Sequence, residues 1–93
     1  MKPTLQKQID EMSEDELKEV LRRDFVRKLT GYRKTDDFYK KKYNMDFVSF
    51  QKANIVEKQN YTFEVESDAQ EWELAIDGIE TVKKKLKDIS GGD

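Results

Sequence analysis

The stretch SDAQEWELAIDGIETVKKKLKDI, residues 67–89, decides the fold. Its apolar side chains recur at intervals of 3, 4, 3, 4 and 3 residues, the spacing of a helix that packs lengthwise against another helix. Ser67 and Gln70 have the form of a capping box, and Gly91-Gly92 is a natural helix end. The residues with this spacing are Trp72, Ala75, Ile79, Val82, Leu86 and Ile89.

A second amphipathic segment precedes this one. Ser13 and Glu16 form another capping box, and acidic residues fill the first turn, where the helix dipole favours them. One unbroken helix from there to Tyr43 would be about 45 Å long, which exceeds a compact domain of this size. The apolar side chains on its stripe are Leu17, Leu21, Phe25, Leu29, Tyr32, Tyr39 and Tyr43.

We therefore expect a break in this segment. Gly31 weakens a helix, and Asp36 falls on the apolar stripe. The sequence thus favours two helices, Glu14–Thr30 and Asp36–Tyr43. Residues 1–12 are predicted to be a frayed lead-in and residues 90–93 a tail.

The segment that follows combines a turn with a short helix. Asn44 suits a left-handed residue that closes the preceding helix, and Asp46 is a candidate cap for a helix with the sequence FVSFQKA. Met45 and Phe50 stand where a hydrophobic staple places its two apolar residues. Residues 54–60 are expected to be a connection.

The hexapeptide YTFEVE, residues 61–66, alternates apolar and polar side chains with a period of two. This pattern is typical of a β-strand. A lone strand leaves its backbone groups without partners, so the alternative is an extended lead-in whose aromatic side chains pack on the following helix. We favour the lead-in and leave the short strand open.

Charge is divided between the two long segments. Residues 17–43 hold ten Lys or Arg against four Asp or Glu, a net charge of +6, whereas residues 57–80 hold eight acids against one Lys, a net charge of −7. We expect the basic first helix and the acidic last helix to pair antiparallel and to neutralise each other along their flanks. The prediction is one all-α domain over residues 1–93, an antiparallel helical hairpin within an array of three to four helices.

Composition excludes several kinds of chemistry. The chain has 93 residues, no Cys and no His, so disulfides, thiolate or imidazole metal sites and Cys or His catalysis are ruled out. It is 41% charged and 35% hydrophobic, which is little apolar material for a core. No segment has the run of about 20 apolar residues that a membrane helix needs, and we expect a cytoplasmic protein without cofactors that gains stability from a partner.

The acidic residues were considered as a metal site and as catalysts. Oxygen ligands alone suit Ca²⁺ or Mg²⁺, but the spacing matches no EF-hand loop, and a solvated acidic face explains it better. Serines without a His partner and a slender hairpin without a pocket give no catalytic centre, so no enzyme is predicted. The carboxylates concerned are Glu64, Glu66, Asp68, Glu71 and Glu73.

A basic cluster on the first helix offers an alternative function, nucleic-acid binding. The short helix after Asp46 presents Phe and Val rather than base-reading side chains, and the net charge of −2 opposes strong phosphate binding. The residues that would carry this alternative are Arg22, Arg23, Arg27 and Arg33.

The run YNMDFVSF, residues 43–50, followed by YTFEVESDAQEWELAIDGIETVKKKL, residues 61–86, resembles a group of small helical prokaryotic proteins. They share a Tyr-Gly-Met-Ser-Phe-x-x-Phe turn, an aromatic and acidic run and a closing amphipathic helix. Some of them look like antitoxins encoded beside compact toxins that act on RNA. The resemblance spans residues 21–86, and its departures, Asn44 for Gly and Asp46 for Ser, keep the turn and cap chemistry.

The resemblance implies a protein–protein interaction module that neutralises a toxin or regulates an enzyme, with self-association as a further possibility. The heptad spacing, the small core and the acidic run beside Trp72 favour the same class. Trp72 is a candidate interface anchor, although simple core packing explains it equally well. The predicted partner-binding residues are Tyr61, Phe63, Glu64, Glu66, Asp68, Glu71, Trp72 and Glu73.

Overall fold

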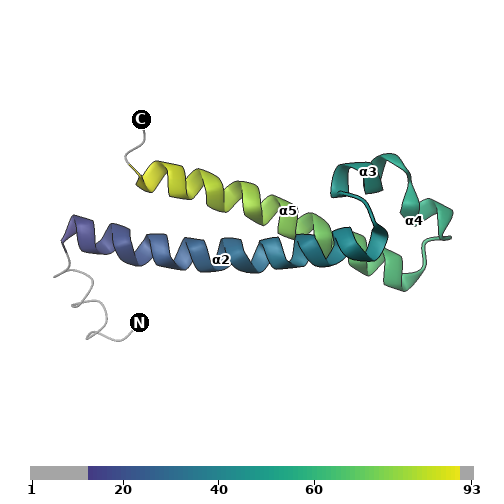
Figure 1. Cartoon of the computed structure of the whole chain (residues 1–93), viewed down its shortest axis with the longest axis horizontal. Coiled ribbons are helices and arrows are strands. Elements are labelled where there is room, and N and C mark those ends of the chain that lie inside the picture. The colour runs from purple at the N-terminus through teal and green to yellow at the C-terminus, as the bar shows by residue number, and fades with distance from the viewer. Residues whose placement is uncertain (1–12, 91–93) are drawn as a thin grey trace.

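The computed structural model describes residues 13–90, which form helices joined by turns and contain no strand (Figure 1). The prediction of an all-α fold is confirmed. The lead-in predicted for residues 1–12 and the glycine end at residues 91–92 lie outside the described residues. The helices are α2 (Glu14–Tyr43), α3 (Phe47–Lys52), α4 (Ile55–Lys58) and α5 (Phe63–Ile89).

Helix α2 is continuous over 30 residues, so the predicted break near Gly31 is wrong. Ser13 caps its start by accepting a hydrogen bond from the Glu16 amide at 3.1 Å, as expected. Asn44 closes it in the left-handed conformation, with φ of 54°. The helix stays unbroken because its stripe is packed against α5, and tertiary packing outweighs the weak propensity of Gly31.

The size argument for a break fails because the molecule is not compact. Its radius of gyration is 18.3 Å, compared with the roughly 12 Å expected for a compact chain of this length. Two long helices lie side by side and form an elongated hairpin (Figure 1).

Helix α5 begins earlier than expected, and both interpretations of residues 61–66 are wrong. Thr62 is the cap and accepts from the Val65 amide, so Phe63–Glu66 form the first turn and Ser67 lies inside the helix. Asn60 and Tyr61 turn the chain into α5 with positive φ values of 57° and 53°. The period of two did not mark one buried face, because Val65 is buried and Phe63 is 85% exposed.

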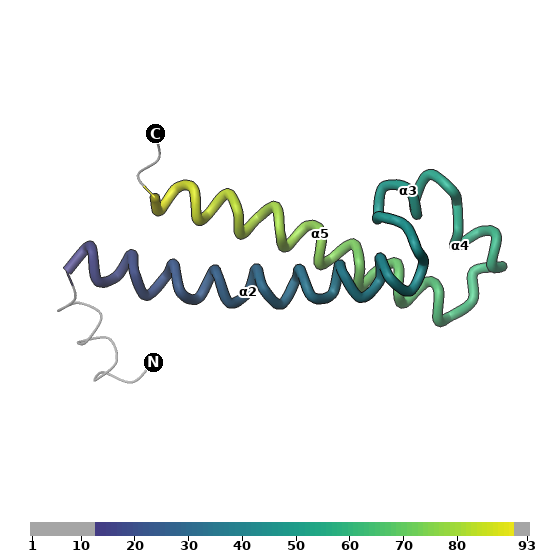
Figure 2. The backbone as a smooth tube through the Cα atoms, viewed as in Figure 1, coloured from purple at the N-terminus to yellow at the C-terminus, as the bar shows by residue number. Residues whose placement is uncertain are grey.

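The helices α2 and α5 run antiparallel, as predicted (Figure 2). Residues later in α2 contact residues earlier in α5. The contacts run from Phe25 with Lys85, through Asp36 with Trp72, to Lys42 with Asp68. The two tubes lie close near α3 and separate towards Glu14 and Ile89. We call the end that carries α3 and α4 the closed end, and the other the open end.

The closed end contains the short helices. Asp46 caps α3 by accepting from the Ser49 amide at 2.8 Å, as predicted. The expected connection over residues 54–60 contains the short helix α4, so that prediction needs correction. Helices α3 and α4 lie against α5 beside the turn (Figure 1). None of the described helices has the length and apolar character to cross a membrane.

Candidate functional site

Trp72 is the centre of the closed end. Its side chain is 0% exposed, and its indole N–H donates to Asp36 Oδ1 at 2.8 Å. Asp36 is itself buried and also pairs with Lys40 at 3.2 Å. The carboxylate therefore satisfies the one polar atom of the tryptophan inside an apolar core. Trp72 is a core residue in this structure and does not reach the surface of the chain.

Aromatic rings surround Trp72 on all the neighbouring elements. The ring centroids of Tyr39 and Tyr43 on α2 lie 5.7 and 6.0 Å from it, and those of Phe47 and Phe50 lie 5.3 and 5.0 Å away. These separations are those of favourable aromatic pairs. The cluster holds α3 against the hairpin and fixes the position of the face that α5 presents outward.

One side of α5 is tied to α2 by charged hydrogen bonds. Lys42 bonds Asp68 and, at 2.9 Å, Glu64, while the Tyr43 hydroxyl donates to Asp68 at 2.6 Å. Burial alone would raise the pKa of Asp68, but the bonds from Lys42 and Tyr43 outweigh it and hold this pKa below its ordinary value. Burial and the Asp68 carboxylate raise the pKa of Tyr43 to about 12.

A neighbouring pair repeats this arrangement. The Tyr39 hydroxyl donates to Glu71, and burial together with this bond raises the pKa of Tyr39. Among the described residues, the ion pairs between α2 and α5 all involve Lys42. The expected neutralisation of the two charged helices is thus local to the closed end, and the other ion pairs of α2 lie within that helix.

The predicted partner-binding residues separate into groups because residues 63–73 are helical. Glu64, Asp68 and Glu71 face α2 and bond its side chains, and Trp72 lies in the core. The others point away from α2 and are exposed: Tyr61, Phe63, Glu66 and Glu73. This second group is accessible for contact with another molecule.

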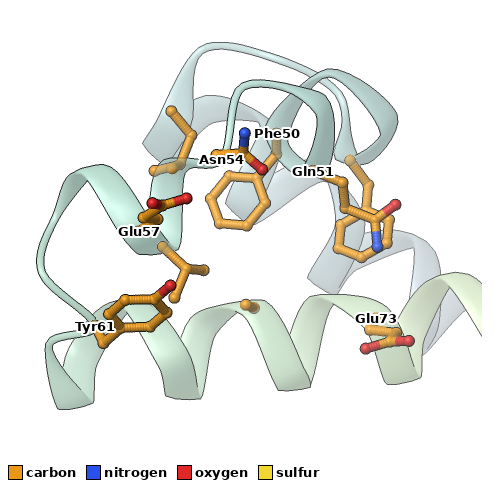
Figure 3. A pocket seen from close by; sticks show the side chains of 10 residues that line it. Phe50, Gln51, Asn54, Glu57, Tyr61 and Glu73 are labelled. Carbon is orange, nitrogen blue, oxygen red and sulfur yellow. The ribbon is translucent and has the colours of Figure 1, made fainter.

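Two of these exposed residues, Tyr61 and Glu73, line a groove between α3–α4 and α5 (Figure 3). Its volume is about 290 Å³, and Phe50 lines its centre. Glu57 and Tyr61 stand at one end and Glu73 at the other, with the amides of Gln51 and Asn54 along the rim. The remaining apolar lining comes from Phe47, Ile55, Val56 and Ala69.

Most residues of this groove were not predicted from the sequence. Only Tyr61 and Glu73 among its lining residues were predicted to bind a partner. A signal was present in Ile55 and Val56, two adjacent apolar residues in a segment expected to be a plain connection. They form part of α4 and supply one wall of the groove.

The arginines of the alternative function lie on the exposed surface of α2. Arg22 and Arg23 pair with Glu19 at 2.6 and 3.6 Å, and Arg27 pairs with Asp24 at 2.8 Å. Arg33 is exposed on the same helix. Acidic neighbours one turn away thus partly neutralise the cluster, which weakens its attraction for phosphate.

The carboxylates considered as a metal site do not converge. Within residues 13–90, no three metal-ligating side chains lie close enough to hold an ion. Glu64 and Asp68 are instead held by Lys42.

Comparisons with models of protein families, with curated proteins and with solved structures returned no match. The site therefore rests on the geometry of this chain alone.

Proposed function

We propose that this protein is a protein-binding module whose closed end docks a basic, apolar-tipped segment of another protein. The observation that carries the proposal is the groove lined by Phe50, Tyr61 and Glu73, together with the exposed Phe63 and Glu66 in the first two turns of α5.

The apolar part of this face supplies affinity. Phe63 is 85% exposed and Tyr61 is 59% exposed, an unusual arrangement for large aromatic side chains in a chain with so few apolar residues. Aromatic residues are enriched among the side chains that dominate protein interfaces. The groove next to them has the size and lining to receive one apolar side chain of a partner.

The charged part supplies selectivity. Glu57 and Glu73 stand at opposite ends of the groove. Glu66 lies one turn before Ala69, another lining residue, in α5. Carboxylates around an apolar groove favour a segment in which Lys or Arg flanks the apolar anchor. An enzyme that acts on RNA needs a basic surface to bind phosphate, so an acidic module can cover that surface. This agrees with the antitoxin-type role that the resemblance implies, in the cytoplasm.

The test is co-expression with the product of the neighbouring gene, followed by purification and measurement of Kd. Phe63→Ala and Glu73→Lys should each weaken the complex at least about tenfold. Phe38→Ala is the matched control, because Phe38 is an aromatic residue on α2 that is 60% exposed and lies outside the proposed face. If the neighbouring product arrests growth, the wild-type chain should relieve the arrest and the two variants should do so less well.

The absence of a complex would overturn the antitoxin-type role. Equal effects of Phe63→Ala and Phe38→Ala would overturn the placement of the site. Salt-sensitive retention of RNA or DNA by the isolated chain, lost in Arg23→Ala and Arg33→Ala, would support the basic helix as the binding surface instead.

A further inference from the structure

At the open end, the described part of α5 ends before it reaches the start of α2. The contacts between the helices set a register in which Phe25 lies opposite Lys85 and Tyr32 opposite Gly78. Continued by one turn, this register brings Leu21 level with Ile89, the last residue of α5. No described residue of α5 therefore lies opposite the first two turns of α2, an overhang of about 10 Å.

Among charged residues, the overhang carries the aliphatic side chains of Leu17 and Val20, and Leu21 lies at its edge, level with Ile89. Leu17, Val20 and Leu21 lie three and four residues apart, so they share one side of the helix. They are 37%, 46% and 38% exposed. We call these three residues the overhang patch. The stripe that runs through Leu17 and Leu21 is buried further along at Leu29.

The distribution of charge at the open end indicates which kind of partner would be complementary to it. The first turn of α2 carries Glu14, Asp15 and Glu16, and the last two turns of α5 carry Lys83, Lys84, Lys85 and Lys87. The open end thus presents an acidic tip beside a basic one. A surface with both signs on either side of an apolar patch is complementary to a copy of itself rotated by a two-fold axis.

We infer that two copies of this chain join through their open ends. The two overhangs lie side by side and antiparallel, and the overhang patch of one copy covers that of the other. Each acidic start of α2 then approaches the lysine-rich end of the partner's α5, where the opposite ends of the helix dipoles add to the attraction. This inference is independent of the closed-end groove, which stays accessible in the dimer.

The experiment is sedimentation of the full-length chain over micromolar to millimolar concentrations. The expected result is a reversible species of twice the chain mass that weakens as salt is raised. Leu21→Glu and Val20→Glu should each raise the dimer Kd at least about tenfold, because both copies then bury a carboxylate in the contact.

Val26→Glu is the matched control. Val26 is the same residue type on the same helix, is 47% exposed and lies on the opposite side of α2 from the overhang patch. It should leave the Kd unchanged, and far-UV circular dichroism should show equal helicity in Val20→Glu and Val26→Glu. A monomer at all concentrations, or equal effects of these two variants, would overturn the inference. Binding of the neighbouring gene product is measured separately, so either proposal can fail alone.

Discussion

The two ends of the hairpin use the same two helices and differ in what fills the space between them. At the closed end, four aromatic rings pack around the buried indole of Trp72, which donates a hydrogen bond to Asp36. At the open end, Leu17 extends past the last residue of α5, Leu21 lies level with it, and both side chains stay partly exposed.

This difference teaches where stability and association belong in a chain with a small core. The buried core cluster, which contains Tyr39, Phe47, Phe50, Val65 and Trp72, lies at one end, so we expect that end to contribute most to stability. The aliphatic side chains left at the other end are available for a contact between molecules. The predictions below test this division of roles.

The largest effect is expected at the centre of the closed end. Trp72→Ala leaves a large cavity and removes the indole N–H that the buried Asp36 carboxylate accepts from, and should lower the free energy of unfolding by about 3–5 kcal/mol. Since small domains are stable by only about 5–15 kcal/mol, much of the folded population would be lost. Urea unfolding followed by circular dichroism at 222 nm measures the change.

The control for this comparison is Leu21→Ala at the open end, measured at a protein concentration low enough to keep the chain monomeric. It should change the free energy of unfolding by no more than about 1 kcal/mol, because the side chain is already 38% exposed. Equal costs for the two substitutions would show that the open end is as well packed as the closed end, contrary to the comparison.

The second prediction concerns the polar atom within the core. Asp36→Ala removes the acceptor of the Trp72 indole N–H and should cost about 1–3 kcal/mol. Asp37→Ala, at the exposed neighbouring position, should cost no more than about 0.5 kcal/mol. Asp36→Asn keeps an acceptor oxygen and should fall between them. If Asp36→Ala and Asp37→Ala have equal effects, the buried hydrogen bond contributes nothing.

Asp36 also illustrates how far the sequence could predict this fold. Its position on an apolar stripe was visible, and a break in the helix was one valid explanation of it. The correct explanation needed a donor 36 residues away, the indole of Trp72. Helical periodicity showed that both residues face inward, but nothing in the local sequence shows that two such residues meet.

The prediction of where α5 begins was wrong for a different reason. Thr62 and Ser67 are both acceptable caps, and a strand-like alternation ran between them. The choice of Thr62 depends on the positive φ values of Asn60 and Tyr61, which turn the chain early. The early start of the helix determined the candidate site. In a helix from Phe63 onward, Glu64, Asp68 and Glu71 lie on the side that faces α2, apart from the exposed residues. An extended segment would not separate them in this way.

A third prediction uses alkaline pH to probe the closed end. The folded protein holds the Tyr43 proton more tightly than the unfolded chain does, because burial and Asp68 raise its pKa from 10.0 to about 12. The stabilisation is complete below pH 10 and is lost as the pH rises from about 10 to about 12. Tyr43→Phe should reduce the loss, measured by urea unfolding from neutral to alkaline pH. An unchanged pH profile in Tyr43→Phe would assign the whole loss to other groups such as Tyr39, whose pKa is also raised.

The smallest effects are expected at the two helical glycines, which lie between the ends. A Cβ on Gly31 would meet no atom within 4 Å, whereas a Cβ on Gly78 would lie 2.5 Å from the Tyr32 ring. Gly31→Ala should therefore raise the free energy of unfolding by about 0.5–1 kcal/mol through helix propensity alone. Gly78→Ala should gain the same propensity and lose more to overpacking against Tyr32, for a net cost of about 1 kcal/mol.

Thermal and urea unfolding of the two variants side by side distinguish these terms. If Gly31→Ala stabilises the protein and Gly78→Ala destabilises it, the backbone of α5 must lie close to Tyr32. Gly78 would then mark the last close contact before the two helices diverge towards the open end. If both alanines stabilise the protein equally, the Tyr32 ring moves aside at little cost. The position at which the hairpin passes from its closed end to its open end would then depend on where the aromatic residues of α2 stop, and not on a close contact at Gly78.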